Sequence, residues 1–223
     1  MRAMILAAGR GERLRPLTDR CPKPLIEVGG KPLITRHIEN LAAAGVTALV
    51  INLGWLGDRI RGHLGSGEAL GVDIAYSQEP PGALETAGGI VQALPLLGAE
   101  PFLVVSADVL SDYRYRRLVN RRPPGLAHLV MVDNPPHHPA GDFALRRDRL
   151  VRNGERRLTY SGIGVFRPEM FDDLEPGRRA LRPVLDRAIE DGRLSGEHYP
   201  GLWMDIGTPE RLASARTHEW NEQ

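Results

Sequence analysis

Short apolar segments alternate with helical patterns along the first half of the chain. The apolar segments cover residues 3–7, 48–53, 72–77 and 101–108. Between them lie segments with helical periodicity, such as residues 32–45, which begin at a proline and end at a glycine. Because the short segments are largely apolar on both faces, the alternation predicts an α/β fold. We expect a parallel sheet that is covered by helices on both sides.

The second half of the chain has a different pattern. Residues 127–134 and 158–168 predict strands, and the segment between them predicts a hairpin that turns around Asn153 and Gly154. Residues 178–194 predict a helix that stops at Gly192, and residues 198–209 predict a late strand followed by a C-terminal helix. No repeat or long linker interrupts the chain, so we expect a single domain over residues 1–223.

Composition and charge argue against several classes of function. The chain has 223 residues and a net charge of +1, which gives no reason to expect nucleic acid or a membrane surface as a partner. No apolar stretch approaches the ~18 residues that a membrane span requires. Cys21 is the one cysteine, which excludes an internal disulfide and fits a reducing compartment. We therefore expect a cytoplasmic protein, and nothing in the sequence predicts an obligate protein partner.

The segment after the first apolar run brings glycines and cations to one place. It contains Gly9, Gly11 and Arg13, and it continues to Lys23, which stands between two prolines. A phosphate loop of the Walker type would need Gly-Lys-Ser/Thr, whereas Glu-Arg-Leu follows Gly11. A dinucleotide fingerprint would need a third glycine, whereas residue 14 is leucine. Two interpretations remain: a loop that wraps a nucleotide with its backbone amides, and a tight turn with solvated arginines.

Two acids stand at the ends of apolar runs. Asp108 ends the run FLVVSAD, and Asp205 ends another run in LWMDIG. In open α/β sheets, ligands bind outside the carboxyl ends of the strands, which places Asp108 at the same edge as Gly9 and Gly11. A carboxylate at such a position is costly unless a cation or a metal compensates its charge. Two such acids over a triphosphate would suit Mg²⁺, which takes one or two carboxylates, phosphate oxygens and waters.

These residues lie in longer stretches that resemble one family, the sugar-phosphate nucleotidyltransferases. LAAGRGERLRPLTDRCPKPLIEVGGKPLI is similar to the signature of that family, and LETAGGI, SAD and WMDIGTPE extend the likeness over nearly the whole chain. The resemblance implies a Rossmann-like nucleotidyltransferase fold, with a mixed central sheet flanked by helices and a small sugar-facing lobe. It also implies that residues 1–125 mainly bind the nucleotide. Residues 126–223 would mainly bind the sugar and supply the second metal ligand.

The same resemblance implies the reaction and its reactants. A nucleoside monophosphate would pass from a nucleoside triphosphate to a sugar 1-phosphate, with Mg²⁺ as cofactor. The stretches YSQE, HLVMVDNPPHHPAGDF and LSGEHYPGLWMDIGTPERL resemble short bacterial members that use UTP and N-acetylmuramate 1-phosphate in peptidoglycan recycling. GTP with mannose 1-phosphate, and thymidine or uridine triphosphate with glucose 1-phosphate, are the alternative pairs. An inactive homologue that binds nucleotide sugars for regulation is an alternative from a different class.

Matching the motifs of the family residue by residue implies a role for each site residue. Arg13 would act on the leaving pyrophosphate, and Lys23 on the α-phosphate and the incoming phosphate. The residues implied to bind the nucleotide are Ala8, Gly9, Gly11, Glu12, Arg13, Lys23, Gln78, Glu79 and Gly88. Those implied to bind the sugar are Ser106, Gly141, Glu155 and Ser161, and those implied to bind the metal are Asp108 and Asp205.

The chain departs from the pattern of the family in the residues before Asp108, where Ala107 replaces the usual glycine, and in one later motif. Ser106 stands where near relatives commonly have asparagine, which changes the group available to the sugar. The Glu-Lys-Pro motif that many relatives use to hold the sugar phosphate is absent, and one of Glu155, Arg156 and Arg157 is expected to replace it. The sugar contacts are therefore the least defined part of the predicted site.

The sequence leaves the roles of two pairs of adjacent residues open. Glu79 fits the family pattern at the base, whereas Gln78 has the better amide for a uracil edge. His137 and His138 lie in a proline-rich loop with too few further ligands nearby for zinc. A position beside the sugar pocket is the expectation for this histidine pair.

Overall fold

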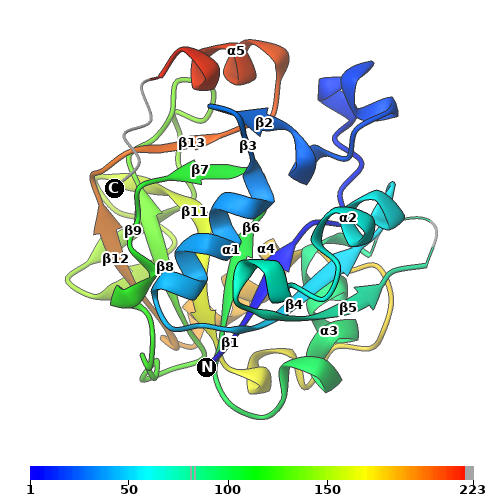
Figure 1. Ribbon diagram of the computed structural model, residues 1–223. Helices are drawn as coiled ribbons and strands as arrows, with labels where there is room; N and C mark the ends of the chain where they lie inside the picture. Colours follow the sequence, from blue (N-terminus) through cyan, green and yellow to red (C-terminus); the bar gives the residue numbers. More distant parts are fainter. Residues whose placement is uncertain (81, 83, 219–223) are drawn as a thin grey trace.

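The computed structural model describes residues 1–80, 82 and 84–218. Over these residues a nine-stranded sheet runs through the centre of the molecule (Figure 1). In order across the sheet, its strands are β5 (Asp73–Gln78), β4 (Ala48–Leu53), β1 (Arg2–Leu6), β6 (Phe102–Ser106), β11 (Arg157–Phe166), β8 (Ala127–Val132), β12 (Leu194–Tyr199), β10 (Arg149–Val151) and β9 (Phe143–Arg146).

The sheet is parallel in one part and mixed in the other. β5, β4, β1 and β6 are mutually parallel, as the apolar alternation predicts. β11 then runs antiparallel to β6 and to β8, while β8 and β12 are parallel. The predicted fold class, an α/β fold with a mixed central sheet flanked by helices, is confirmed.

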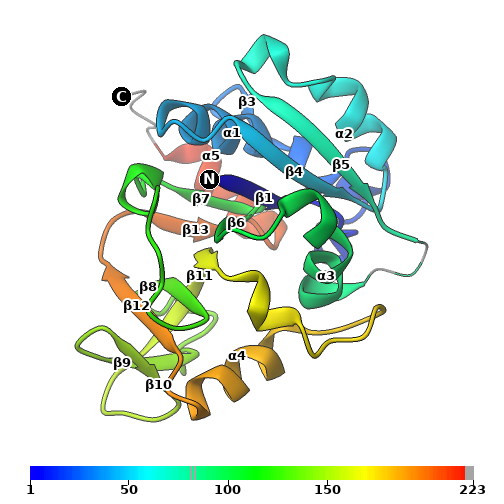
Figure 2. The same cartoon turned by 90° about the horizontal axis from the view of Figure 1, so that it is seen from below.

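Helices cover both faces of the sheet (Figure 2). One face carries α1 (Leu33–Ala43) and α2 (Gly57–Leu64), and the other carries α3 (Glu85–Leu97) and α4 (Leu181–Glu190). Alternate side chains of β1 reach the two separate cores. Ala3 and Ile5 pack into the first core, and Met4 packs into the second. This arrangement explains why the strands of the first half are apolar at successive positions.

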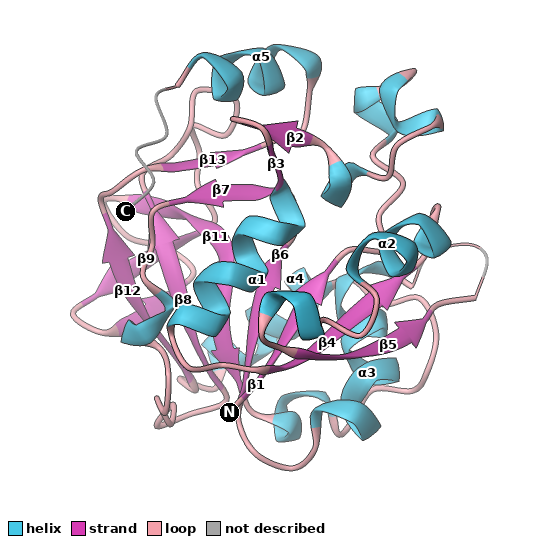
Figure 3. Cartoon of the chain, in the orientation of Figure 1, coloured by secondary structure: helices cyan, strands magenta, loops and turns pink. Residues whose placement is uncertain are grey.

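Two smaller sheets and the last helix lie above the main sheet (Figure 3). β7 (Val109–Ser111) pairs with β13 (Trp203–Asp205), and β2 (Glu27–Val28) pairs with β3 (Lys31–Pro32). Helix α5 (Pro209–Thr217) follows β13. Leu14, Ile26, Ile206 and Leu212 share a third core, so α5 packs on the segment that follows β1. The segment that follows β1 and helix α5 thereby meet beside the carboxyl edge of the sheet.

Two local predictions for the second half are wrong. The hairpin turns between β9 and β10 at Arg147, which has a φ of +58°, and Asn153 and Gly154 lie in the following loop. The predicted late strand is interrupted after Tyr199, so β12 joins the main sheet while β13 joins β7. The first difference comes from a tighter local turn at residues 147–148, and the second from pairing partners of β12 and β13 that are distant in sequence. No helix in the described part of the chain is long and apolar enough to cross a membrane.

A buried polar cluster joins β8, β12 and the segment after β7. His128 is fully buried, and its Nε2 lies 3.4 Å from Glu197 Oε2. The hydroxyl of Tyr113 donates to Glu197 Oε1 at 2.8 Å, and Arg117 Nη2 lies 3.3 Å from the same oxygen. The hydrogen bond from His128, the bond from Tyr113 and the charge of Arg117 together lower the pKa of Glu197 from 4.5 to about 2.

We predict that Glu197→Gln lowers the free energy of unfolding by roughly 1.5–3 kcal/mol at pH 7, the usual contribution of a hydrogen bond to a charged group. Because the pKa of Glu197 is lower in the folded protein, its contribution is full above about pH 4.5. It is lost as the pH falls toward 2. Urea unfolding of both proteins at pH 7 and pH 3.5 should show a smaller difference at the lower pH.

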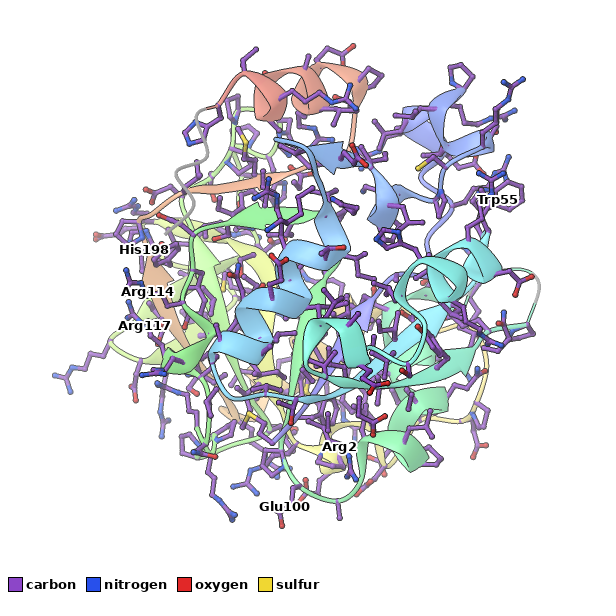
Figure 4. The ribbon with its side chains drawn as sticks, in the orientation of Figure 1. Arg2, Trp55, Glu100, Arg114, Arg117 and His198 are labelled. Atoms are coloured by element: carbon purple, nitrogen blue, oxygen red, sulfur yellow. The ribbon has the colours of Figure 1, made fainter. Side chains whose placement is uncertain are left out.

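Glu100 provides the control for this prediction. Its pair with Arg122 joins side chains that are each 74% exposed (Figure 4). Glu100→Gln should therefore leave stability almost unchanged at both pH values, because exposed ion pairs contribute little. A difference for Glu197→Gln that is independent of pH would contradict the electrostatic account of the cluster.

Candidate active site

The carboxyl ends of three parallel strands form the floor of the site. Leu6 of β1 is in register with Asn52 of β4 on one side and with Ser106 of β6 on the other. The backbone N–H of Ala7 donates to Asn52 Oδ1 at 2.7 Å, and the N–H of Ala107 donates to Leu6 O at 3.1 Å. These bonds fix the points at which the chain leaves β1 and β6.

The loop after β1 borders the smaller of two adjoining cavities. Gly11 has a φ of +69°, and a Cβ at this position would lie 3.0 Å from Thr18 Cγ2, so both backbone and space favour glycine. The guanidinium of Arg10 lies 3.7 Å from the ring centre of Trp55, whose indole N–H donates to Thr18 O at 2.8 Å (Figure 4). A Cβ at Gly9 would contact nothing within 4 Å. The contacts of Trp55 with Arg10 and Thr18 therefore hold the loop in place, and the space at Gly9 is open to a ligand.

Lys23 points from this loop region to the end of β6. Pro22 and Pro24 flank it and restrict its backbone, and Lys23 begins a short 3-10 turn. The side chain is 14% exposed, and its aliphatic part lies beside Gly11. Its ammonium group donates to Asp108 Oδ2. The lysine is thus held in one direction by its neighbours in sequence and by an acid 85 residues away.

The two predicted metal ligands are brought together by the pairing of β7 with β13. Asp205 is the register partner of Val109, and the N–H of Ile206 donates to Asp108 O at 2.8 Å. Asp108 and Asp205 both line the larger cavity. Residues that are 97 positions apart in the chain, at 108 and 205, therefore lie on neighbouring backbones at one cavity wall.

Each of these two acids has a cation as partner. Asp205 Oδ2 accepts from Arg211 Nη1, just as Asp108 accepts from Lys23. The same Arg211 nitrogen lies 2.7 Å from His137 Nε2, which itself lies 3.0 Å from Asp205 Oδ1. A ring nitrogen that accepts from Arg211 has no hydrogen to donate to Asp205. Asp205 Oδ1 is therefore left without a hydrogen-bond partner among the described residues, although it is buried.

The donor set at these two acids fits a divalent cation. A buried carboxylate oxygen that lacks a hydrogen-bond partner is costly, and coordination to a metal would compensate it. Asp108 and Asp205 supply two carboxylates, which is the number that Mg²⁺ takes when substrate phosphates and waters complete its ligands. No cluster of three or more His, Cys, Asp or Glu side chains that could hold a metal by itself occurs in the described parts of the chain.

Two cavities adjoin at this edge of the sheet. The smaller has a volume of about 320 Å³, and its wall includes Ala8, Gly9, Gly11, Lys23, Asn52, Glu79 and Asp108. The larger has a volume of about 730 Å³, and its wall includes Arg13, Ser106, Asp108, His137, His138, Asp142, Tyr160, Ser161, Arg182, Asp205 and Arg211. Ser106 and Asp108 border both cavities. A ligand in one cavity can therefore meet a ligand in the other at Asp108.

The structure separates the roles of Gln78 and Glu79. Glu79 is buried, and its two oxygens accept from Asn52 Nδ2 at 2.7 Å and from the N–H of Leu84 at 3.0 Å. It lines the smaller cavity and organises its wall. Gln78 is exposed, and its amide donates to Leu53 O at 3.3 Å. Gln78 is not among the residues that line either cavity.

Two other residues assigned to the nucleotide lie outside the cavity walls. Glu12 is 63% exposed in its side chain and pairs with Arg10 at 2.8 Å. Gly88 packs under another loop, where a Cβ would clash with Gly177 O. The next residue, Gly89, packs against the wall of the smaller cavity, because a Cβ there would lie 2.6 Å from Glu79 Oε1.

Only some of the residues assigned to the sugar line the larger cavity. Ser106 and Ser161 line the larger cavity. Gly141 does not, but it has a φ of +60° and directly precedes Asp142, which does. Glu155 lies in the exposed loop before β11, away from the cavity wall.

Sequence reasoning missed Asn52, Asp142 and Arg211. Arg211 was not recognisable, because it lies within the sequence of a helix. In the folded chain Thr208 caps α5, and Arg211 in the first turn of this helix contacts Asp205. Asn52 ends an apolar strand in the same way as Asp108 does, so the strand-end rule could have found it.

Comparison with known proteins shows the family of this chain. Residues 2–145 match the family described as Nucleotidyl transferase. An N-acetylmuramate alpha-1-phosphate uridylyltransferase of Neisseria meningitidis is 55% identical over 224 residues, which cover 97% of this chain and 97% of that protein. This chain belongs to the nucleotidyltransferase family. The predicted family is thus confirmed.

Further relatives agree with this assignment. A protein of Caulobacter vibrioides with the same printed name is 37% identical, over 96% of this nucleotidyltransferase and 94% of that protein. Among solved structures, HddC from Yersinia pseudotuberculosis complexed with GMP-PN has a TM-score of 0.80. It is 21% identical, over 96% of this chain and 97% of that chain, and this likeness concerns the fold. Members of the family generally depend on a divalent metal, which agrees with the acid pair.

Proposed function

We propose that this nucleotidyltransferase transfers the uridylyl group of UTP to N-acetylmuramate 1-phosphate and releases pyrophosphate. The observation that carries the proposal is the meeting of two cavities at Asp108, with Lys23 on the nucleotide side and Asp205 on the sugar side. The choice of substrates is supported by the relative at 55% identity, whose name states that activity.

The reaction needs no base from the protein. An oxygen of the sugar phosphate attacks the α-phosphorus of UTP, and the bond from this phosphorus to the bridging oxygen breaks. Pyrophosphate leaves with the electron pair of that bond. The second pKa of a phosphate monoester is about 6, so the attacking oxygen is already an anion at neutral pH. The protein must therefore position two anions and compensate their charge.

The cations of the site suit these tasks. Lys23 lines the smaller cavity and contacts Asp108 at its boundary with the larger one. It would contact the α-phosphate, where negative charge collects during the transfer. Arg13 lines the larger cavity and has no ion-pair partner within residues 1–80, 82 and 84–218. It would bind the leaving pyrophosphate. Mg²⁺, held by Asp108 and Asp205, would supply further positive charge to the phosphate oxygens.

The proposal assigns the two substrates mainly to different halves of the chain. Residues 1–125 would supply most of the nucleotide site, and residues 126–223 most of the sugar site together with Asp205. The wall of the smaller cavity, which contains the hydrogen-bonded pair of Glu79 and Asn52, would recognise the base of the nucleotide, because Gln78 lies outside this wall. UTP is a metabolite of the cytoplasm, so we place the reaction there.

A screen for pyrophosphate release tests the proposal. The four nucleoside triphosphates are each combined with the 1-phosphates of N-acetylmuramate, N-acetylglucosamine, mannose and glucose, with Mg²⁺ in excess. The proposal predicts the highest kcat/KM for UTP with N-acetylmuramate 1-phosphate. A preference for GTP with mannose 1-phosphate would replace the proposed substrates. Absence of turnover with every pair would favour an inactive homologue that binds nucleotide sugars.

The dependence of the rate on pH should follow the phosphate nucleophile. We expect kcat/KM to fall below about pH 6, where the monoester gains its second proton, and to stay level above neutrality. His137→Asn and His138→Asn should leave the shape of this profile unchanged, because neither side chain moves a proton in the proposed reaction. The measurement is kcat/KM from pH 5 to 9 at saturating Mg²⁺. Loss of the acid limb in either variant would reveal a general base.

A further inference from the structure

Arg211 is held rigidly at the sugar side of the site. It lies in the first turn of α5, and its side chain is 18% exposed. One nitrogen, Nη1, contacts both Asp205 Oδ2 and His137 Nε2. An arginine whose guanidinium is fixed by two partners on one nitrogen is already oriented for a ligand, and loses little freedom when it binds one.

The rest of this guanidinium is available to an anion. Within the described residues, Nε and Nη2 of Arg211 have no hydrogen-bond partner. Nη2 lies over Gly207, where a Cβ would clash with it and would lie 3.0 Å from Nη2 of Arg13. Two guanidinium groups therefore lie close together at Gly207, and that of Arg211 contacts Asp205. Metal binding at Asp205 would further reduce the negative charge that this carboxylate offers to Arg211.

The other arginines of the larger cavity are Arg13, which is assigned to the leaving pyrophosphate, and Arg182, which is already matched by acids. Arg182 contacts Asp186 at 3.0 Å and Asp142 at 3.4 Å, and it lies over the ring of Phe143. His138 contacts the same Asp142 at 3.2 Å. Arg211 lines only the larger cavity, away from the glycine loop and Lys23. Its free edge is therefore open to a ligand in the larger cavity, where the sugar substrate is placed and where Arg13 is assigned to the pyrophosphate.

We propose that Arg211 binds the carboxylate of the lactyl ether on the sugar and thereby selects N-acetylmuramate. The inference rests on the proposed function, since that sugar carries a second anionic group besides its phosphate. A planar guanidinium matches a carboxylate with two parallel hydrogen bonds, which a neutral hydroxyl at the same place cannot form. His137 is a positioning residue in this account, because it acts by orienting Arg211.

Two substrates that differ only in the lactyl ether test this inference. For the wild type and for Arg211→Gln and Arg211→Lys, kcat/KM is measured with N-acetylmuramate 1-phosphate and with N-acetylglucosamine 1-phosphate. Arg211→Gln should lower the ratio of the two values about 10- to 100-fold, mainly through KM for the first sugar. Arg211→Lys should recover part of the ratio. An equal loss with both sugars would show that Arg211 acts on the shared phosphate, and would overturn the inference.

A matched control and a second readout complete the experiment. Arg182→Gln removes another arginine of the larger cavity and should change the values for both sugars alike, because that arginine is already paired with acids. Calorimetric binding of UDP-N-acetylmuramate and UDP-N-acetylglucosamine gives the same ratio without turnover, and thermal unfolding checks that the variants fold. Wild-type protein that uses neither sugar would contradict the proposed function. The binding ratio would still decide on Arg211, since an unchanged ratio in Arg211→Gln overturns its role.

Discussion

Asp108→Asn is expected to abolish turnover while leaving the fold intact. The substitution keeps the shape of the side chain but removes the charge that compensates Lys23 and that would hold the metal with Asp205. Asp108 borders both cavities, and its backbone lies beside that of Asp205, which lines the larger one. We expect a fall in kcat of at least 10³-fold at saturating Mg²⁺, since removal of one electrostatic group alone costs 10² to 10³.

Asp112→Asn is the matched control for this variant. Asp112 follows β7, is exposed, and accepts from the hydroxyl of Tyr199 at 2.5 Å outside both cavities. It should retain full activity. Binding of Mn²⁺ in the presence of nucleotide, followed by its magnetic resonance signal, should be lost in Asp108→Asn and kept in Asp112→Asn. Unchanged activity in Asp108→Asn at saturating Mg²⁺ would contradict the assignment of this ligand.

Lys23→Ala should lower kcat by about 10²-fold or more, with a smaller effect on KM for UTP. The two prolines and Asp108 hold the ammonium group in place before substrate binds, so its charge acts where the transition state gains charge. Steady-state kinetics at saturating sugar phosphate separate the two parameters. A change confined to KM would mean that Lys23 only binds the substrate.

The double variant Lys23→Ala with Asp108→Asn adds a further check. Since the two side chains contact each other, their effects should not be additive. We expect the double variant to be little worse than Asp108→Asn alone. Additive losses would show that the two residues act at separate steps.

Much of the fold could be predicted because its signals are local. The apolar segment 48–53 is strand β4, and the helix predicted from Pro32 to Gly45 is α1. One failure arose where pairing is decided at a distance, since nothing near Tyr199 indicates that β12 and β13 join different sheets. The other was local: the Asn153–Gly154 signal was outweighed by a tighter turn between β9 and β10.

The site shows the same division between local and distant causes. The rule for strand ends placed Gly9, Gly11 and Asp108 at one edge, and the structure brings them to the walls of adjoining cavities. The same rule could have found Asn52, but not its hydrogen bond to Glu79, which depends on the distance between two neighbouring strands. Arg211 required the fold as well, since it reaches Asp205 from the following helix.

The central claim is that Lys23, Asp108 and Asp205 direct attack at the α-phosphorus of UTP. Phosphorus NMR of the complete reaction with N-acetylmuramate 1-phosphate and Mg²⁺ tests it most directly, because each possible bond cleavage gives different products. The account predicts equal amounts of a nucleotide-sugar diphosphate and pyrophosphate, formed as UTP and the sugar phosphate disappear together. UDP with a doubly phosphorylated sugar, or free phosphate with unchanged sugar phosphate, would place the attack at the terminal phosphorus and contradict the account.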